Sequence, residues 1–229
     1  MPSYETTSGL ILRIRPLSDT SLIVHWLTPD LGRLATVAKG ARGAKSSFRG
    51  KLDIFYHCDL SFARSRRSDL HALREVMLKE THGKLRTDWG ALQQAAYAVS
   101  FLEKNTETET PVPEVYDLIT GYITHLAAKG ASKSLVPAME WKFLEVLGLT
   151  PELESIRIAP AAKQWLESVS GAGWEEIAAP AGCPKIEDDI TRFLQRYIQY
   201  HCGRIPPGRN AALGADAVGT ESGIQNSES

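Results

Sequence analysis

The sequence is poor in cysteine and has no long apolar run. Its three cysteines, Cys58, Cys183 and Cys202, lie far apart among 229 residues and form no CxxC pair. This spacing argues against a disulfide framework and against a zinc site made of thiolates. No apolar run approaches the roughly 20 residues that a helix needs to cross a bilayer. The first ten residues lack the basic and apolar segments of a signal peptide, so we expect a cytoplasmic protein without membrane partners.

The common motifs of catalytic and phosphate-binding sites are also missing. There is no GxxxxGK[ST], no HExxH and no GxSxG, and the six histidines are scattered. Glu187, Asp188 and Asp189 could suggest a metal site. They fall in the first turn of an expected helix, where carboxylates interact favourably with the helix dipole, and we prefer that interpretation. We therefore predict that the protein is not an enzyme and has no catalytic residue, no metal and no cofactor.

Charge is distributed unevenly along the chain. Residues 1–78 contain twelve Lys or Arg against seven Asp or Glu, a net charge of +5, whereas residues 79–229 have a net charge of −6. Residues 31–52 contain six basic residues and no acid. A basic part joined to an acidic remainder can attract phosphates at one end without making the whole protein bind polyanions.

The first 80 residues have the pattern of a small β-barrel. Segments rich in β-forming residues lie between turn residues, at about 9–17, 21–28, 33–41, 52–62 and 70–78. The last but one, LDIFYHCDLSF, alternates most regularly, which predicts that Leu52, Ile54 and Tyr56 share one face with Cys58, Leu60 and Phe62. Five strands without a long helix favour a barrel of the oligonucleotide-binding (OB) type.

Helical spacing of apolar residues replaces this alternation after about residue 84. The stripes predict five helices, one of which begins near Pro113 and another of which ends at Gly148. From Gly203 onward the chain is small, polar and rich in Pro and Gly, and we expect disorder there. The predicted class is α+β, with a five-stranded OB-type barrel at 1–80, an all-helical domain at 81–202 and a disordered tail at 203–229.

The stretch KGARGAKSSFRGKL (39–52) falls between two expected strands, in a position from which OB barrels bind single strands. Its basic side chains would neutralise phosphates, and Phe48 would stack on a base, an interaction of about 1–3 kcal/mol. A second basic turn, ARSRRSD (63–69), would extend this surface. The residues predicted to bind DNA are Arg33, Lys39, Arg42, Lys45, Phe48, Arg49, Lys51, Arg64, Arg66 and Arg67.

Other interpretations of the basic stretch stay open. A basic run can be only a solvated surface, and Phe48 can pack back into the barrel. The barrel could also bind folded RNA, or the loop could contact an acidic protein in a scaffold that binds no nucleic acid. Salt separates these cases, because phosphate binding weakens steeply as the salt concentration rises.

The run TPDLGRLATVAKGARGAKSSFRGKLDIF (28–55) resembles a segment of the RecO recombination-mediator family. The residues that carry the resemblance are Thr28, Gly32, Arg33, Ala38 to Arg42, Ser46, Phe48, Gly50, Leu52 and Phe55. GLILRIRPLSDTSLIVHWLT (9–28) is similar to the first hairpin of that family, and EWKFLEVLGLTPEL (140–153) is similar to part of its helical domain. The resemblance spans about residues 8–202.

This resemblance implies a bacterial DNA-repair protein with an N-terminal OB domain and a helical C-terminal domain. Such a protein would bind single- and double-stranded DNA, anneal complementary strands, and help RecR to place RecA on DNA coated by single-strand-binding protein. It would work in the cytoplasm, associated with the nucleoid. Annealing would need charge neutralisation and no catalytic residue.

The resemblance has one departure and suggests one further contact. Many family members carry a four-cysteine zinc module, but the corresponding region here, 154–185, contains only Cys183. We therefore predict no zinc, because a tetrahedral site needs four ligands. The family binds the acidic tail of single-strand-binding protein through its helical domain, which suggests Trp141 and Lys142 as a docking spot. The alternative is that Lys142 is an exposed lysine above core aromatics.

Overall fold

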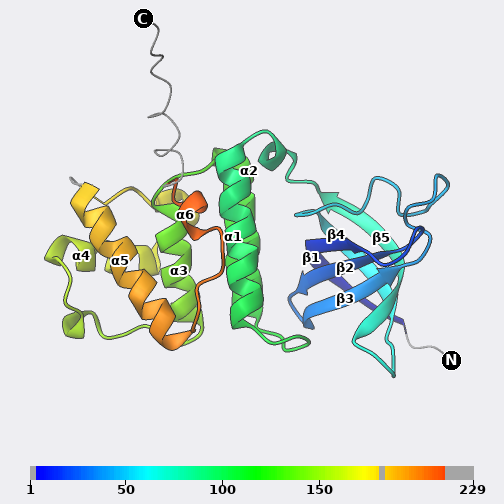
Figure 1. Ribbon diagram of the computed structural model, residues 1–229, viewed down its shortest axis with the longest axis horizontal. Coiled ribbons are helices and arrows are strands. Elements are labelled where there is room, and N and C mark those ends of the chain that lie inside the picture. Colours follow the sequence, from blue (N-terminus) through cyan, green and yellow to red (C-terminus); the bar gives the residue numbers. More distant parts are fainter. Residues whose placement is uncertain (1–3, 181–183, 215–229) are drawn as a thin grey trace, which may run out of the picture. The chain divides into compact units, whose positions relative to one another are not determined.

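The structure is a computed structural model that describes residues 4–180 and 184–214. The N-terminal part is the predicted five-stranded barrel (Figure 1). Its strands are β1 (Tyr4–Pro16), β2 (Leu22–Thr28), β3 (Gly32–Ala38), β4 (His57–Ala63) and β5 (Leu70–Glu80). They close in the order β1-β2-β3-β5-β4, and β3 pairs with β5 in parallel while the other pairs are antiparallel. Closure leaves few free strand edges, as an OB-type barrel requires.

The barrel core follows from the alternation of each strand. Ile11 of β1 lies opposite Trp26 of β2, and Trp26 lies opposite Leu34 of β3, so these side chains form one inward row. All three are almost fully buried. The indole of Trp26 donates a hydrogen bond of 2.8 Å to the Thr36 hydroxyl, so these two buried polar groups are paired.

One strand is shorter than the alternation predicts. We expected a strand from residue 52, but β4 begins at His57 and residues 52–56 form a turn. The backbone of Phe55 is left-handed, with φ of 63°, and its N–H donates to the Ile11 carbonyl. This turn buries Phe55 and exposes Ile54, so the predicted face is correct for Cys58, Leu60 and Phe62 and wrong for Ile54.

The rest of the chain is helical, as predicted (Figure 1). The longer helices are α1 (Trp89–Asn105), α2 (Pro113–Lys129), α3 (Leu135–Val146), α4 (Pro160–Gly171) and α5 (Pro184–His201). The short ones are α6 (Arg209–Ala212) and the 3₁₀ turns η1 (Gly83–Arg86), η2 (Leu153–Ser155) and η3 (Trp174–Glu176). None of the helices in the described ranges is long and apolar enough to cross a membrane.

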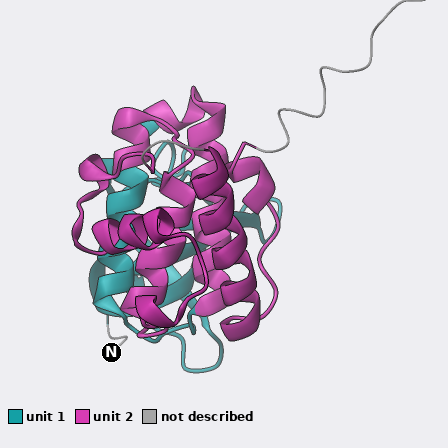
Figure 2. Ribbon diagram, turned by 90° about the vertical axis from the view of Figure 1, so that its left-hand side faces the viewer, with its two compact units in different colours: residues 1–83, 106–124 teal, residues 84–105, 125–229 magenta. Residues whose placement is uncertain are grey.

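The chain divides into two compact units (Figure 2). The first comprises residues 1–83 and 106–124, and the second comprises residues 84–105 and 125–229. The expected barrel boundary at residue 80 is close to this division, but residues 106–124 were expected in the helical domain. They belong with the barrel because the backbone N–H of Glu109 donates to the Arg33 carbonyl at 2.7 Å, which adds this segment to the edge of β3.

The expected disorder from residue 203 is wrong for residues 203–214. Arg209 of α6 is buried and forms an ion pair of 2.6 Å with Glu140 of α3, which is also buried. The side chain of Gln94 donates to the Ala212 carbonyl at 3.0 Å. Both contacts fix the segment in the helical unit, and the remainder of the expected tail, 215–229, lies outside the described residues.

Candidate nucleic-acid interface

The outer face of β2 and β3 is the first part of the candidate interface. In OB barrels this face and the β1–β2 and β4–β5 loops bind oligonucleotides. The strand register places two rows of side chains across this face, and the rows are two residues apart along each strand. The rows are Arg13, His25, Ala35 and Leu70, and Arg15, Ile23, Val37 and Ala72. Each row thus begins with an arginine on β1; the first continues over His25, Ala35 and Leu70, and the second over apolar side chains.

Sequence reasoning missed Arg13 and Arg15, although a signal for them was present. In GLILRIRPL the two arginines stand two positions apart, and they flank Ile14, which packs against the core. A period of two places both arginines on the face opposite to Ile14. The alternation of β1 was therefore sufficient to predict that Arg13 and Arg15 lie on the outer face, but the predicted DNA-binding residues all came from further along the chain.

The basic loop, residues 39–52, lies at the end of this face where β3 stops. It is built from successive tight turns, in which the N–H groups of Gly43, Ser46 and Arg49 each donate to a carbonyl three residues earlier. The loop is tied to the β1–β2 connection, since the Arg42 N–H donates to the Thr20 carbonyl at 3.0 Å and its guanidinium donates to the Ser18 carbonyl at 3.1 Å. Four of its predicted DNA-binding residues are exposed, and a fifth is half-buried: Lys39, Arg42, Lys45, Arg49 and Lys51.

Phe48 does not take the predicted role. Its side chain is only 7% exposed and belongs to the barrel core cluster, so it cannot stack on a base in this conformation. The ring is an apolar anchor that holds the basic loop against the barrel. Burial of a phenylalanine in a core is strongly favourable, which explains why the ring turns inward from a loop that is otherwise exposed.

The second basic turn connects β4 to β5 and is partly neutralised. The Arg64 guanidinium donates to both carboxylate oxygens of Glu5, at 2.7 and 2.9 Å, and to Glu109 at 2.7 Å. The hydrogen bond to Glu5 is the main cause of the raised pKa of Arg64 and of the lowered pKa of Glu5. Arg66 and Arg67 are exposed in the same turn. These two residues are therefore better placed than Arg64 to meet a phosphate.

Residues 106–110, here called the acidic strap, contact the side chains of Arg33 and His71. The Arg33 guanidinium donates to the hydroxyl of Thr106 at 2.8 Å and to its carbonyl at 2.5 Å. Glu109 accepts a hydrogen bond of 2.6 Å from Nε2 of His71, which is buried. Nδ1 of His71 accepts the N–H of Ser65 at 3.3 Å, so both ring nitrogens are hydrogen-bonded. Arg33 thus holds the strap, and we leave it out of the candidate interface.

Trp141 and Lys142 do not form the exposed docking spot that the sequence suggested. Trp141 is 2% exposed, and its indole donates to the Ser170 hydroxyl at 2.9 Å. The Lys142 amino group donates to the Ala172 carbonyl at the end of α4, at 2.8 Å, and lies 5.9 Å from the centroid of the Trp174 ring. Partial burial lowers the pKa of Lys142. Both side chains stabilise the packing of α3 against α4.

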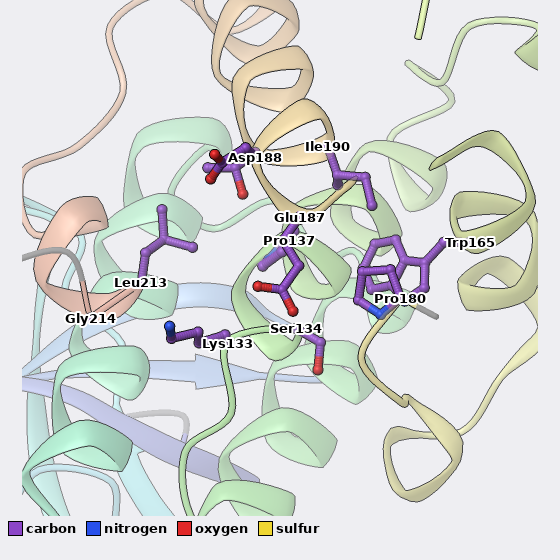
Figure 3. A pocket seen from close by; sticks show the side chains of 11 residues that line it. Lys133, Ser134, Pro137, Trp165, Pro180, Glu187, Asp188, Ile190, Leu213 and Gly214 are labelled. Atoms are coloured by element: carbon purple, nitrogen blue, oxygen red, sulfur yellow. The ribbon is translucent and has the colours of Figure 1, made fainter. Parts of the chain in front are cut away.

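A pocket of about 240 Å³ in the second unit is lined by residues of α3, α4 and α5 (Figure 3). Glu187 and Asp188 reach it from the first turn of α5, Trp165 reaches it from α4, and Lys133 stands at its edge. Two carboxylates at the pocket disfavour phosphate binding there. Within residues 4–180 and 184–214, no cluster of three or more His, Cys, Asp or Glu side chains could hold a metal, and Cys183 lies outside these residues.

Two family models match the sequence. The model described as Recombination protein O N terminal matches residues 1–82, which contain the barrel, and the model described as Recombination protein O C terminal matches residues 86–156, which contain α1 to α3.

Relatives named DNA repair protein RecO match over longer segments. The protein of Roseiflexus sp. (strain RS-1) is 30% identical over 200 residues, which cover 82% of this chain and 69% of that protein. The protein of Anaeromyxobacter dehalogenans (strain 2CP-C) is 28% identical over 65% of this chain and 58% of its own length. That of Syntrophus aciditrophicus (strain SB) is 26% identical over 68% of this chain and 60% of its own length, so the chain spans less than two thirds of these two relatives. Since both family models match in order, on a barrel and then on helices, the chain belongs to the RecO family.

Proposed function

We propose that the protein is a DNA repair and recombination mediator that binds single- and double-stranded DNA on its barrel and anneals complementary strands. The observation that carries this proposal is the exposed basic loop, which follows the end of β3 and is tied to the β1–β2 connection by the hydrogen bonds of Arg42. The contact surface would comprise the loop cations, the exposed pair of the β4–β5 turn and the two arginines of β1. These residues are Lys39, Arg42, Lys45, Arg49, Lys51, Arg66, Arg67, Arg13 and Arg15.

Annealing follows from charge neutralisation on this surface. Two complementary strands repel each other, and cations that bind their phosphates reduce this repulsion and raise the local concentration of both. The bases then select each other by pairing, so the protein needs no bond-making or bond-breaking group. The small apolar side chains between the arginine rows and the loop would leave room for bases beside the neutralised backbone.

The family supports further partners for this activity. The protein would act with RecR to load RecA on DNA covered by single-strand-binding protein, in the cytoplasm near the nucleoid. The contact with the tail of single-strand-binding protein would lie in the helical unit, at a place other than the buried Trp141. The second candidate is an OB barrel that binds RNA without annealing activity, because the same cations would bind either polymer.

An annealing assay with two complementary labelled oligonucleotides tests the proposal. The variant carries Lys39→Glu with Arg42→Glu, two exposed residues of the basic loop. The matched control carries Lys185→Glu with Arg157→Glu, which makes the same charge change at exposed positions of the second unit. We expect wild type and control to accelerate annealing, the loop variant to lose most of the acceleration, and salt to suppress it steeply.

Three outcomes contradict the proposal. If the folded wild type does not accelerate annealing but binds structured RNA, the RNA-binding alternative replaces it. If binding of an acidic protein survives high salt while DNA binding is absent, the loop serves a scaffold. If the loop variant anneals as fast as the control, the basic loop is not the site, and circular dichroism of each variant establishes that the comparison is between folded proteins.

A further inference from the structure

The C-terminal half of α5 and the segment after it form a basic surface in the second unit. Residues 190–214 contain four arginines and no Asp or Glu, although residues 79–229 as a whole are acidic. Arg209 is buried in its pair with Glu140. The side chains of Arg192, Arg196 and Arg204 are exposed; that of Arg192, which contacts Asp189 at 3.2 Å, is 58% exposed.

Aromatic side chains accompany these arginines. Phe193 and Tyr197 have ring centroids 5.5 Å apart, Tyr197 and His201 are 4.2 Å apart, and His201 and Tyr200 are 4.8 Å apart. The Tyr197 hydroxyl donates to the Leu149 carbonyl at 2.7 Å, which fixes this series of rings to the helical core. Tyr200 ends the series and is 84% exposed.

The spacing along α5 places cations and the exposed ring in one line. Residues four positions apart on a helix lie on the same face. Arg192, Arg196 and Tyr200 follow this spacing, so two guanidinium groups and one aromatic face lie in sequence along the helix. Successive phosphates and bases of a single strand require contacts of these two kinds in alternation.

A groove runs beside this line. It has a volume of about 330 Å³ and is formed by Gln195 and Gln199 of α5 and by residues 205–211, and none of its lining residues is an Asp or Glu. Gly203 and Gly208 have positive φ and turn the chain back along the helix. The buried pair of Arg209 and Glu140 holds the far wall in place. The groove is therefore preformed, polar and free of carboxylates.

We propose that this α5 surface, consisting of Arg192, Arg196, Tyr200, Arg204 and the adjoining groove, binds a single strand of nucleic acid. Tyr200 stacks on a base, and the three arginines bind phosphates. The proposal deepens the proposed function, because annealing brings two strands together and the barrel and the α5 surface each hold one of them. A protein partner fits less well, since one fully exposed ring among arginines offers little continuous apolar area.

Photocrosslinking tests this proposal without depending on the barrel. An oligonucleotide substituted with 5-iodouracil is irradiated with the protein, and the crosslinked peptides are identified by mass spectrometry. We expect crosslinks at Tyr200 in wild type. We also expect the variant Arg196→Glu with Tyr200→Ala to lose these crosslinks, to keep those of the barrel, and to anneal about tenfold more slowly. The control is Arg157→Glu with Trp89→Ala, an exposed cation and a 71% exposed ring elsewhere in the same unit.

The outcomes separate this inference from the proposed function. Crosslinks on the barrel alone, with annealing unchanged in the Arg196 and Tyr200 variant, overturn the α5 surface and leave the barrel site intact. Crosslinks at Tyr200 without any on the barrel overturn the barrel site and support the α5 surface. Equal loss of annealing in the Arg157 and Trp89 control also overturns the inference, because the effect is then one of net charge.

Discussion

At the scale of single residues, the environment decides which of several similar side chains is available to a ligand. Arg33 and Arg42 are both arginines near the basic loop, but Arg33 holds the acidic strap while Arg42 remains exposed at the loop surface. Phe48 and Tyr200 are both aromatic residues beside arginines, yet one is 7% and the other 84% exposed. In each comparison the contacts that the side chain makes in the folded chain decide its exposure, which the residue type alone does not.

The burial of Phe48 leads to a prediction about stability. We expect Phe48→Ala to lower the free energy of unfolding by about 3 kcal/mol, because it removes a ring from the barrel core and leaves a cavity. Urea unfolding measures this loss. DNA affinity of the folded variant should change less than in the Lys39→Glu and Arg42→Glu variant. Unchanged stability with strongly reduced DNA binding would contradict the anchor role and restore the stacking role.

At the scale of elements, the acidic strap, which precedes α2, packs closely against a glycine at the start of β3. Gly32 has φ of 68°, and a Cβ at this position would lie 2.3 Å from the Thr110 carbonyl oxygen. We expect Gly32→Ala to be more destabilising than Gly40→Ala. Gly40 has a nearly identical φ of 69°, but no atom lies within 4 Å of its added Cβ, so that variant reports the backbone strain of about 1 kcal/mol alone. Equal unfolding midpoints for the two variants would show that the strap does not pack against β3.

The strap also neutralises the second basic turn, which leads to a prediction about DNA binding. Glu109 pairs with Arg64 and His71, so Glu109→Gln leaves Arg64 with Glu5 as its remaining carboxylate partner. We expect the variant to bind single-stranded DNA more tightly, with a steeper salt dependence. The slope should rise by at most about 0.7, the value of one phosphate contact on a single strand.

Glu107→Gln is the matched control for this prediction. Glu107 lies in the same strap and is exposed, and the change in charge is identical. A titration of labelled oligonucleotide at several salt concentrations compares the two variants. Equal gains would mean that the strap acts only through its net charge, and no gain in either would mean that phosphates do not reach the β4–β5 turn.

The elements that the sequence predicted are those with local causes. Pro113 begins α2 and Gly148 follows the end of α3, as their backbone preferences require, and the period of 3.6 is visible within each helix. The strap depends on contacts between Arg33 and Thr106, which are 73 residues apart, so no local sequence pattern predicts it. The turn at Phe55 likewise depends on hydrogen bonds to Ile11. Long-range pairing therefore accounts for the parts that the sequence did not predict.

The candidate site divides in the same way. The exposed cations of the basic loop could be predicted, because an acid-free run between two strands lies at a surface. The burial of Phe48 was one of two alternatives that the sequence left open. Arg33's contact with the strap and the pairing of Arg64 with Glu5 could not be predicted, because each joins segments that only the folded barrel brings together. Arg13 and Arg15 could have been predicted from the alternation of β1.

At the scale of the whole molecule, charges segregate along the chain but not strictly by unit. The barrel region is basic overall, yet the acidic strap belongs to the first unit and the α5 surface lies in the acidic second part. The local exposure of cations is therefore a better indicator of a polyanion-binding site than the net charge of a segment is. Electrostatic attraction acts over about 8 Å at physiological ionic strength, so the local arrangement decides binding.

The ionisable groups of both units make stability depend on pH. Burial is the main cause of the lowered pKa of His57, in the first unit, and of His125, in the second. A hydrogen bond from Lys79 is the main cause of the lowered pKa of Asp59, and one from Arg64 has the same effect on Glu5. In each case the unfolded chain takes up protons more readily than the folded chain, so acid favours unfolding.

We therefore expect the free energy of unfolding to fall as the pH is lowered, first below about 6.5 as the histidines protonate and again below about 4.5 as the carboxylates do. Urea unfolding at pH 8, 6 and 4 measures this decline. His57→Gln should flatten the part of the decline that begins below about pH 6.5, because it removes a ring whose pKa is lowered by burial. A midpoint that rises on going from pH 7 to 5 would mean that the folded protein gains protons there, against the direction that burial imposes on both histidines.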